Sequence, residues 1–202
     1  YYRLLAARYL PVEVKRVLWL DADMIVRKPL DELYGVDLEG KWTAACGYGP
    51  VMQGLIHDNA VTIGLSDLDM YFNAGVMLYD LDKCRAADFT AMQEAFLSEG
   101  RKLLFPGQDL VNKLFDGHVK MMDYRIFNSM IHCIDGEEDL HYAQDHAAIV
   151  HFPGQAKPWK FNDIHFAAEW EAVFRRCLGD DAPLRRMSYF ALQAMFNKVK
   201  KA

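Results

Sequence analysis

The 202-residue sequence predicts a mixed α/β protein, because short apolar runs of strand length alternate with segments of helical pattern. The run at residues 16–20 is continuously apolar and ends abruptly in acids, which is typical of a strand buried on both faces of a parallel sheet. The other expected strands are residues 42–46, 72–81, 119–122 and 147–152. The expected helices are residues 1–10, 29–34, 82–99, 108–115, 166–178 and 184–200, and a loop or short helices are expected over 47–70.

Composition sets the class of protein before any motif is considered. Apolar residues make up 52% and charged residues 25%, which favours one folded domain with a sizeable core. A net charge of −5 argues against a general nucleic-acid binder, and no apolar run has the length of a membrane span or of a signal peptide. The four cysteines lie far apart without a Cys-x-x-Cys pair, so a reducing compartment is expected.

The charge is concentrated at one end of the chain. Residues 183–202 contain five basic and no acidic side chains, so the remainder carries −10. Apolar residues recur there at steps of three and four, as in an amphipathic helix. Such a helix suits an anionic membrane surface, and it equally suits packing on the core with a solvated basic face.

The most distinctive motif is Asp21-Ala22-Asp23, which directly follows the apolar run at 16–20. Two carboxylates at the end of a strand suit Mg²⁺ or Mn²⁺, since hard oxygen ligands are preferred by both ions. The same spacing recurs at residues 67–69 and 80–82, but only the first example lies between two apolar segments. Surface acids in a turn are the alternative.

Three further motifs place polar groups beside apolar strands or at a helix start. His151 ends a strand and is followed by Gly154 and Lys157, a glycine that allows close backbone approach and a cation that can meet a phosphate. Asn73 lies within an apolar strand and needs partners, which a ligand hydroxyl or neighbouring backbone could supply. Gln108 and Asp109 open a helix, where the simplest role for the acid is capping.

Taken together and in this order, these motifs resemble the retaining glycosyltransferases of family eight, which includes glycogenin and bacterial lipopolysaccharide galactosyl- and glucosyltransferases. The resemblance runs from Tyr1 to Trp159. It rests on the tyrosine- and arginine-bearing helix at 1–9, Leu-Asp-Ala-Asp at 20–23, Phe-Asn-Ala-Gly at 72–75, Gln-Asp at 108–109, and His-Phe-x-Gly-x-x-Lys-Pro-Trp at 151–159.

The resemblance implies a fold of the nucleotide-diphospho-sugar transferase type, a GT-A-like and Rossmann-like mixed sheet. It implies a glycosyltransferase domain over residues 1–180, followed by the basic amphipathic helix over 181–202. Family members begin with strands and helices that hold the base and ribose, and this sequence does not contain them. The strand at 16–20 is therefore expected to lie at a sheet edge.

The activity implied is metal-dependent transfer of glucose or galactose from a UDP-hexose to a saccharide or lipid-linked acceptor, with retention of configuration. The setting implied is lipopolysaccharide or cell-surface glycan synthesis in the cytoplasm, with peripheral membrane contact through residues 183–202 and no nucleic-acid partner. The alternative is a non-catalytic remnant that binds a glycan or a protein.

The resemblance also implies roles for individual residues. Mn²⁺, or Mg²⁺, would be bound by Asp21, Asp23 and His151. The donor-binding residues implied are Arg3, Asp21, Ala22, Asp23, Asn73, Ala74, Gly154 and Lys157, with Gly154 and Lys157 at the diphosphate. Gln108 and Asp109 are the catalytic candidates: a carboxylate could form a covalent intermediate, whereas an amide carbonyl could steady an oxocarbenium-like state.

One departure from the family pattern is local. Gly107 stands where family members often have an acid before Gln-Asp, which affects the contacts expected with the donor sugar or the acceptor. A different reading, a zinc site built from His132, Cys133, His141, His146 and His151, matches no established ligand spacing.

Overall fold

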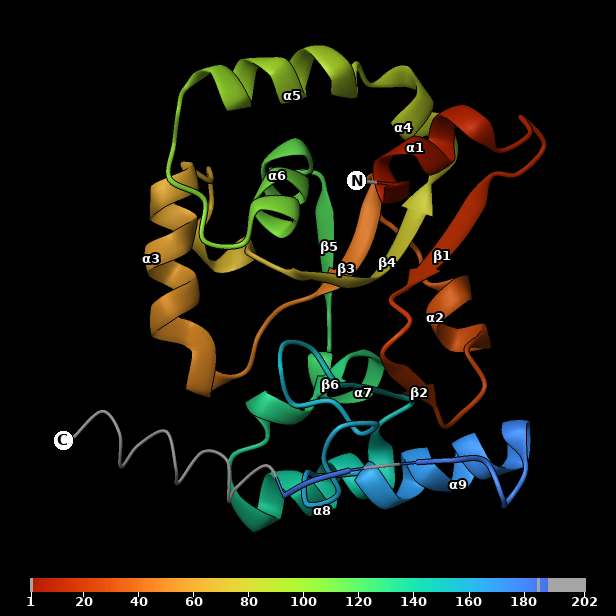
Figure 1. Cartoon of the computed structure of the whole chain (residues 1–202). Coiled ribbons are helices and arrows are strands. Elements are labelled where there is room, and N and C mark those ends of the chain that lie inside the picture. The colour runs from red at the N-terminus through yellow and green to blue at the C-terminus, as the bar shows by residue number, and fades with distance from the viewer. Residues whose placement is uncertain (1, 185, 189–202) are drawn as a thin grey trace, which may run out of the picture.

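Two small sheets meet near the middle of the molecule, and helices surround both. The computed structural model describes residues 2–184 and 186–188. A four-stranded sheet has the order β1-β4-β3-β5, and a three-stranded sheet has the order β2-β7-β6. In Figure 1 the first sheet lies above the second, with α1, α3, α4, α5 and α6 around it and α7, α8 and α9 around the lower sheet.

The larger sheet is mixed, as the resemblance implied. Its strands are β1 (Arg16–Leu20), β4 (Asn73–Asp80), β3 (Thr43–Cys46) and β5 (Val119–Met122). β1 and β3 pair antiparallel with β4, and β3 pairs parallel with β5. The expectation that β1 is buried on both faces of a parallel sheet is wrong: it has one strand neighbour, and its five residues are half-buried. Its position at an edge of the described sheet was expected and is confirmed.

β4 is the central strand and carries the core on both of its faces. Met77 and Tyr79 face the largest apolar cluster, which includes residues of α1 (Tyr2–Tyr9), α3 (Gln53–Ile63) and α6 (Pro106–Leu114). Val76 and Leu78 face the opposite side, towards α2 (Asp31–Gly35) and its flanking loop. Alternation along the strand therefore buries every residue from Asn73 to Tyr79, which explains the nearly continuous apolar sequence.

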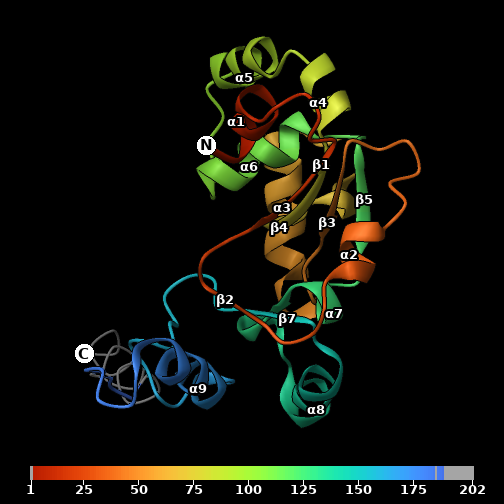
Figure 2. The same ribbon diagram turned by 90° about the vertical axis from the view of Figure 1, so that its right-hand side faces the viewer.

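The smaller sheet contains β2 (Met24–Val26), β7 (Ile149–His151) and β6 (Ser129–Met130). β7 pairs antiparallel with β2 and parallel with β6. Around it lie α7 (Tyr124–Phe127), α8 (Gly136–His146) and α9 (Ala167–Leu178), as the side view in Figure 2 also shows. The chain passes from the larger sheet into the smaller one between β1 and β2, through Asp21, Ala22 and Asp23.

Several helices differ from the expectation. The segment 82–99 forms two helices, α4 (Leu81–Ala86) and α5 (Phe89–Ser98), because Asp88 caps a new helix through the Ala91 N–H. The segment 47–70 contains an eleven-residue helix, α3, between the short turns η1 (Pro50–Met52) and η2 (Leu68–Met70). The sequence did not predict the helices α7 and α8, the strand β6 or the short turn η3 (Ile131–Cys133).

The basic helix expected over 184–200 falls almost entirely on residue 185 and residues 189–202, outside the described residues. Its membrane contact, the cytoplasmic location and the division at residue 180 stay predictions. Among the residues that the structure describes, no helix is long and apolar enough to cross a membrane.

The thiols give a test of this fold. Cys46, Cys84 and Cys133 are buried and Cys177 is exposed, and all four are free. Burial raises the pKa of Cys84 to about 12, and burial also raises the pKa values of Cys46 and Cys133. Only the thiolate reacts with Ellman's reagent, so we expect one fast thiol in the native protein and four after denaturation. A Cys177→Ser variant should lose the fast phase; fast reaction of a second thiol would contradict the fold.

Candidate functional site

The two carboxylates of the Asp-Ala-Asp motif lie where the two sheets meet. The Asp21 N–H donates to the Gly75 carbonyl at 2.9 Å, which ties the end of β1 to β4. The Phe152 N–H donates to the Asp23 carbonyl at 2.9 Å, next to the pairing of Met24 with His151. The backbone therefore fixes Asp21 against one sheet and Asp23 against the other.

Asp21, Asp23 and His151 form the site's candidate metal ligands. Their ligand atoms lie within 4.8 Å of one another, and no other group of three or more His, Cys, Asp or Glu side chains does so within the described part of the chain. His151 is 2% exposed, and its Nε2 lies 3.3 Å from Asp23 Oδ1. Two carboxylates and an imidazole fit a divalent ion such as Mn²⁺. The zinc site considered from the sequence, which used His132, Cys133, His141, His146 and His151, does not form in the described part of the chain.

The orientation of His151 is set by a chain of buried amides. His151 Nδ1 lies 2.9 Å from Asn128 Oδ1, and Asn128 Nδ2 donates to Asn73 Oδ1 at 3.0 Å. Because the Asn128 oxygen can only accept, the imidazole donates from Nδ1 and directs Nε2 towards Asp23 and Asp21. Asn128 follows α7 without any recognisable motif, so sequence reasoning missed it.

Asn73 has its hydrogen bonds satisfied within the protein. Its Oδ1 also accepts from the Gly75 N–H at 2.9 Å. Its Nδ2 donates to Tyr48 Oη at 3.1 Å and to Gln108 Oε1 at 3.2 Å. The partners that this buried amide required are thus neighbouring side chains and one backbone group, and Asn73 still lines the cavity described below.

Gly75 allows β4 and His151 to approach each other. A methyl group on Gly75 would lie 2.5 Å from His151 Cε1 and 2.9 Å from Asn73 Oδ1. Such distances are well inside van der Waals contact, so no larger residue fits without displacing the imidazole or the amide. The glycine of the Phe-Asn-Ala-Gly motif is therefore required by packing against His151.

Asp23 lies between His151 and Lys157. Burial by itself would raise the pKa of Asp23, but hydrogen bonds and charge interactions with His151 and Lys157 outweigh it and hold the pKa well below its usual range. The Lys157 ammonium contacts the Asp23 carboxylate and donates to the Phe152 carbonyl at 2.5 Å. Lys157 therefore lies at the carboxylate pair, where an anionic ligand would need positive charge.

Arg3 reaches the other carboxylate from α1. Its guanidinium donates to Asp21 Oδ1 at 3.1 Å and to the carbonyl of Ala74. Trp19 Nε1 donates to the same Asp21 oxygen at 2.9 Å, and the Arg3 guanidinium lies 5.4 Å from the Trp19 ring centre. Trp19 thus positions both groups, a role that its apolar sequence context did not indicate.

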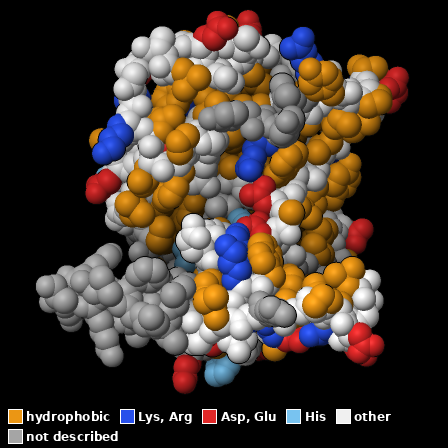
Figure 3. Space-filling view, viewed as in Figure 1, with side chains coloured by type: hydrophobic (Ala, Val, Ile, Leu, Met, Phe, Trp, Pro, Cys, Tyr) orange, Lys and Arg blue, Asp and Glu red, His pale blue; other side chains and the backbone are white. Residues whose placement is uncertain are grey.

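A cavity of about 300 Å³ opens over this cluster. In Figure 3 acidic and basic side chains lie together in a hollow at the centre of the molecule, between apolar regions. Gly154 lines the cavity with a φ of 74°, a left-handed conformation that favours glycine. The lining consists of Arg3, Asp21, Asp23, Asn73, Ala74, Gly75, Gly107, Gln108, Val111, His151, Pro153 and Gly154.

Gln108 and Asp109 point in different directions from the start of α6. Gln108 lines the cavity; its Oε1 accepts from the Ala74 N–H at 3.2 Å and its Nε2 donates to Tyr48 Oη at 2.7 Å. Asp109 is 0% exposed and does not belong to that lining. Its carboxylate accepts from Phe105 N–H at 2.8 Å, Asn59 Nδ2 at 2.7 Å and Tyr71 Oη at 2.5 Å. The capping role considered from the sequence is therefore present.

Comparison with known proteins gives the family of this chain. The model of the family described as "Glycosyl transferase family 8" matches residues 1–163, and the chain belongs to this family. Lipopolysaccharide 1,2-glucosyltransferase of Escherichia coli is 29% identical over 194 residues, which cover 86% of this chain and 56% of that protein. General stress protein A of Bacillus subtilis (strain 168) is 24% identical, over 75% of this chain and 55% of that protein. The chain thus spans about half the length of these curated relatives.

Solved structures show the same architecture. Galactosyltransferase LgtC in complex with donor and acceptor sugar analogs has a TM-score of 0.67 and 28% identity, covering 91% of this chain and 68% of that one. An active-site mutant of LgtC has a TM-score of 0.71 and 26% identity, covering 87% and 66%. These matches confirm the expected mixed α/β fold of the GT-A type.

Gly75→Ala tests the close approach of β4 and β7. The new methyl group must displace His151 or Asn73, so we expect Mn²⁺ affinity to fall about tenfold or more, in the range found when a ligand's supporting contacts are lost. Isothermal titration with Mn²⁺ measures this directly. Gly107→Ala is the matched control, because its new methyl group would meet nothing within 4 Å. Unchanged affinity in Gly75→Ala would contradict the packing argument.

Asp109→Ala tests the buried cap. The change leaves Asn59, Tyr71 and the Phe105 N–H without their acceptor in the core, so we expect a loss of about 2–4 kcal/mol of unfolding free energy in urea denaturation. The control is Asp88→Ala at the exposed start of α5, where loss of a cap costs about 1 kcal/mol. Equal losses in the two variants would show that the carboxylate of Asp109 has no special structural role.

Proposed function

We propose that this chain carries the catalytic site of a metal-dependent retaining hexosyltransferase that moves glucose or galactose from a UDP-sugar to a saccharide acceptor. The observation that carries the proposal is the cluster of Asp21, Asp23 and His151 beneath a cavity that Arg3 and Gln108 also line. Membership in glycosyl transferase family 8 supports transferase chemistry. The names of the relatives, a lipopolysaccharide glucosyltransferase and a galactosyltransferase, support the two hexoses and glycan synthesis.

The three candidate metal ligands support Mn²⁺ as the bound ion, with Mg²⁺ as the alternative. Two carboxylates would suit either ion, and the imidazole of His151 shifts the preference towards Mn²⁺. A divalent ion held by these three residues would stabilise, as a Lewis acid, the negative charge of a departing nucleoside diphosphate. The amide chain from Asn73 through Asn128 keeps the imidazole orientated for that contact.

The cations of the site support a diphosphate leaving group. Transfer breaks the bond between the anomeric carbon and a diphosphate oxygen, and negative charge accumulates on that oxygen. Lys157 contacts Asp23, and Gly154, three residues earlier in the chain, lines the cavity with a left-handed backbone conformation. An ammonium at this point would stabilise the charge as it develops. Arg3, held by Asp21 and the Ala74 carbonyl, would orient donor hydroxyl groups.

Of the two catalytic candidates, the surroundings of Gln108 favour a direct contact with substrate. Gln108 lines the cavity, whereas the Asp109 carboxylate is buried and accepts three hydrogen bonds from the protein. We propose that Gln108 faces the reacting sugar and that Asp109 acts as a positioning residue through Tyr71, whose hydroxyl accepts from Gln108 Nε2 at 3.1 Å. An amide carbonyl near the anomeric carbon suits same-face attack on an oxocarbenium-like state.

Asp23→Ala tests the proposal. We expect Mn²⁺-dependent release of UDP from UDP-glucose or UDP-galactose by the protein, and a decrease of about 100-fold or more in the variant, since an essential ligand and its charge are lost. The coupled assay for UDP is run with and without EDTA. Asp82→Ala is the matched control, because Asp82 belongs to another Asp-x-Asp sequence and lies on the exposed side of α4.

The control should keep the wild-type rate. If Asp23→Ala matches the wild-type protein while EDTA has no effect, the metal assignment is wrong. If neither protein releases UDP nor binds UDP in calorimetry with Mn²⁺, the proposed function is wrong for this chain, and the result favours the alternative of a non-catalytic chain that binds a glycan or a protein.

A further inference from the structure

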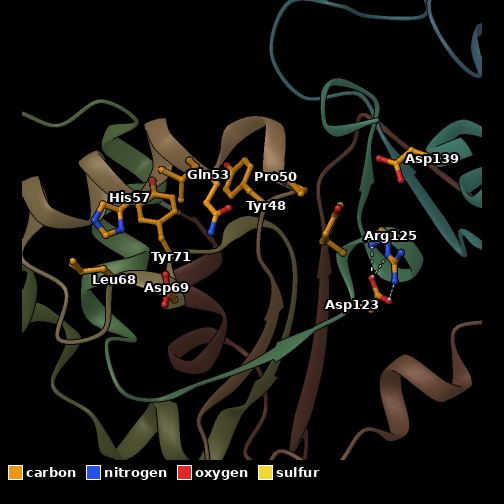
Figure 4. A pocket seen from close by; sticks show the side chains of 12 residues that line it. Tyr48, Pro50, Gln53, His57, Leu68, Asp69, Tyr71, Asp123, Arg125 and Asp139 are labelled. Atoms are coloured by element: carbon orange, nitrogen blue, oxygen red, sulfur yellow. Dashed lines mark hydrogen bonds and ion pairs between the residues drawn. The ribbon is translucent and has the colours of Figure 1, made fainter. Parts of the chain in front are cut away.

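A second and larger cavity lies next to the one over the metal ligands. Its volume is about 680 Å³, and Figure 4 shows it as a groove between α3 with η2 on one side and α7 with α8 on the other. The lining residues used below are Tyr48, Tyr71, Asp69, Asp123, Tyr124, Arg125 and Asp139. None of the metal or donor candidates lines it.

The two cavities share a wall of hydrogen-bonded side chains. Tyr48 and Tyr71 line the second cavity, and both hydroxyls accept from Gln108 Nε2, which belongs to a residue lining the first. Tyr48 Oη also accepts from Asn73 Nδ2 at 3.1 Å. A molecule in the second cavity would therefore lie one side chain away from the proposed donor sugar.

The lining combines aromatic rings with hydrogen-bond acceptors. Tyr48 and Tyr124 are aromatic residues of the lining, which suit contact with the C–H groups of a sugar, and the carboxylates can accept hydrogen bonds from its hydroxyl groups. The volume is within the usual range for a small-molecule site. These properties favour a saccharide over a purely apolar ligand.

The charge of the lining is negative. Asp69, Asp123 and Asp139 supply three carboxylates against the single guanidinium of Arg125. Arg125 pairs with Asp123 at 3.4 Å and stacks over Tyr142, so Asp123 compensates its positive charge. The carboxylates of Asp69 and Asp139 then give the lining its net negative charge. Asp69 and Asp139 project from opposite walls, as Figure 4 shows. Burial and then the Asp139 carboxylate raise the pKa of Tyr124, in agreement with a negative potential.

We infer that this second cavity receives the acceptor saccharide and selects by charge, with an amino sugar preferred, a neutral sugar accepted and a phosphorylated sugar rejected. The inference rests on the proposed transferase function. The net negative charge of the lining would attract an ammonium group in the cavity, whereas it would repel a phosphate group.

Three probes that share one sugar ring and differ in net charge test the inference: methyl glucoside, methyl glucosaminide and methyl glucoside 6-phosphate. Each is titrated into the full chain with Mn²⁺ and UDP by calorimetry. We expect the glucosaminide to bind about threefold to tenfold more tightly than the neutral glucoside, and the phosphate more weakly than either. Raising the salt concentration should narrow these differences.

The double variant Asp69→Asn with Asp139→Asn keeps the side-chain size and removes two charges. We expect it to lose the preference for the glucosaminide and to bind the phosphate better than the wild-type chain does. Asp58→Asn with Glu138→Gln is the matched control, because these exposed acids lie on α3 and α8, two helices beside the second cavity, and line neither cavity. The control should keep the wild-type order of affinities.

Other outcomes overturn the inference. Binding of the phosphate as tightly as the glucosaminide, absence of binding by all three probes, or an unchanged order in the double variant would each do so. Release of UDP from a UDP-sugar is measured in parallel without any acceptor. Failure of that reaction contradicts the proposed function, whereas normal UDP release with unselective sugar binding contradicts only the role of the second cavity.

Discussion

The close approach of β4 to β7 at Gly75 is the constraint on which the site depends. Only a residue without a side chain lets His151 lie against β4, and Asn73 fills the remaining space two residues earlier. The same stretch of β4 holds Asp21 through the Gly75 carbonyl. One short segment therefore fixes a carboxylate, an imidazole and an amide relative to one another, which a flexible loop could not do at this precision.

A continuous set of hydrogen bonds connects the candidate metal ligands to the start of α6. It runs from His151 through Asn128 and Asn73 to Gln108, and from Gln108 through Tyr71 to Asp109. Within the described residues, no buried side-chain nitrogen or oxygen atom lacks a partner. Because an unpaired polar group in this network would be costly, each member restricts the orientation of the next. The network thus gives rigidity to a region made largely of polar side chains.

Much of the fold could be predicted from local sequence. Alternation of apolar runs and helical patterns identified the strands of the larger sheet, and the order of the motifs identified the family. The helix α8 was missed, and α3 was expected only as a loop or short helices, because their periodicity is weak and their stability depends on packing against distant segments. The environment of β1 was misjudged because an apolar run does not reveal how many strand neighbours it has.

The sequence by itself determined the chemistry that is present: two carboxylates after a strand, a histidine at the end of another, and a glutamine and an aspartate opening a helix. Only the tertiary structure decided which of these groups meet. Gln108 and Asp109 are adjacent in the chain, yet successive residues of a helix point about 100° apart. One therefore faces the cavity while the other caps the helix inside the core. Trp19, Tyr48 and Asn128 act through partners that packing brings near, and no local pattern marks them.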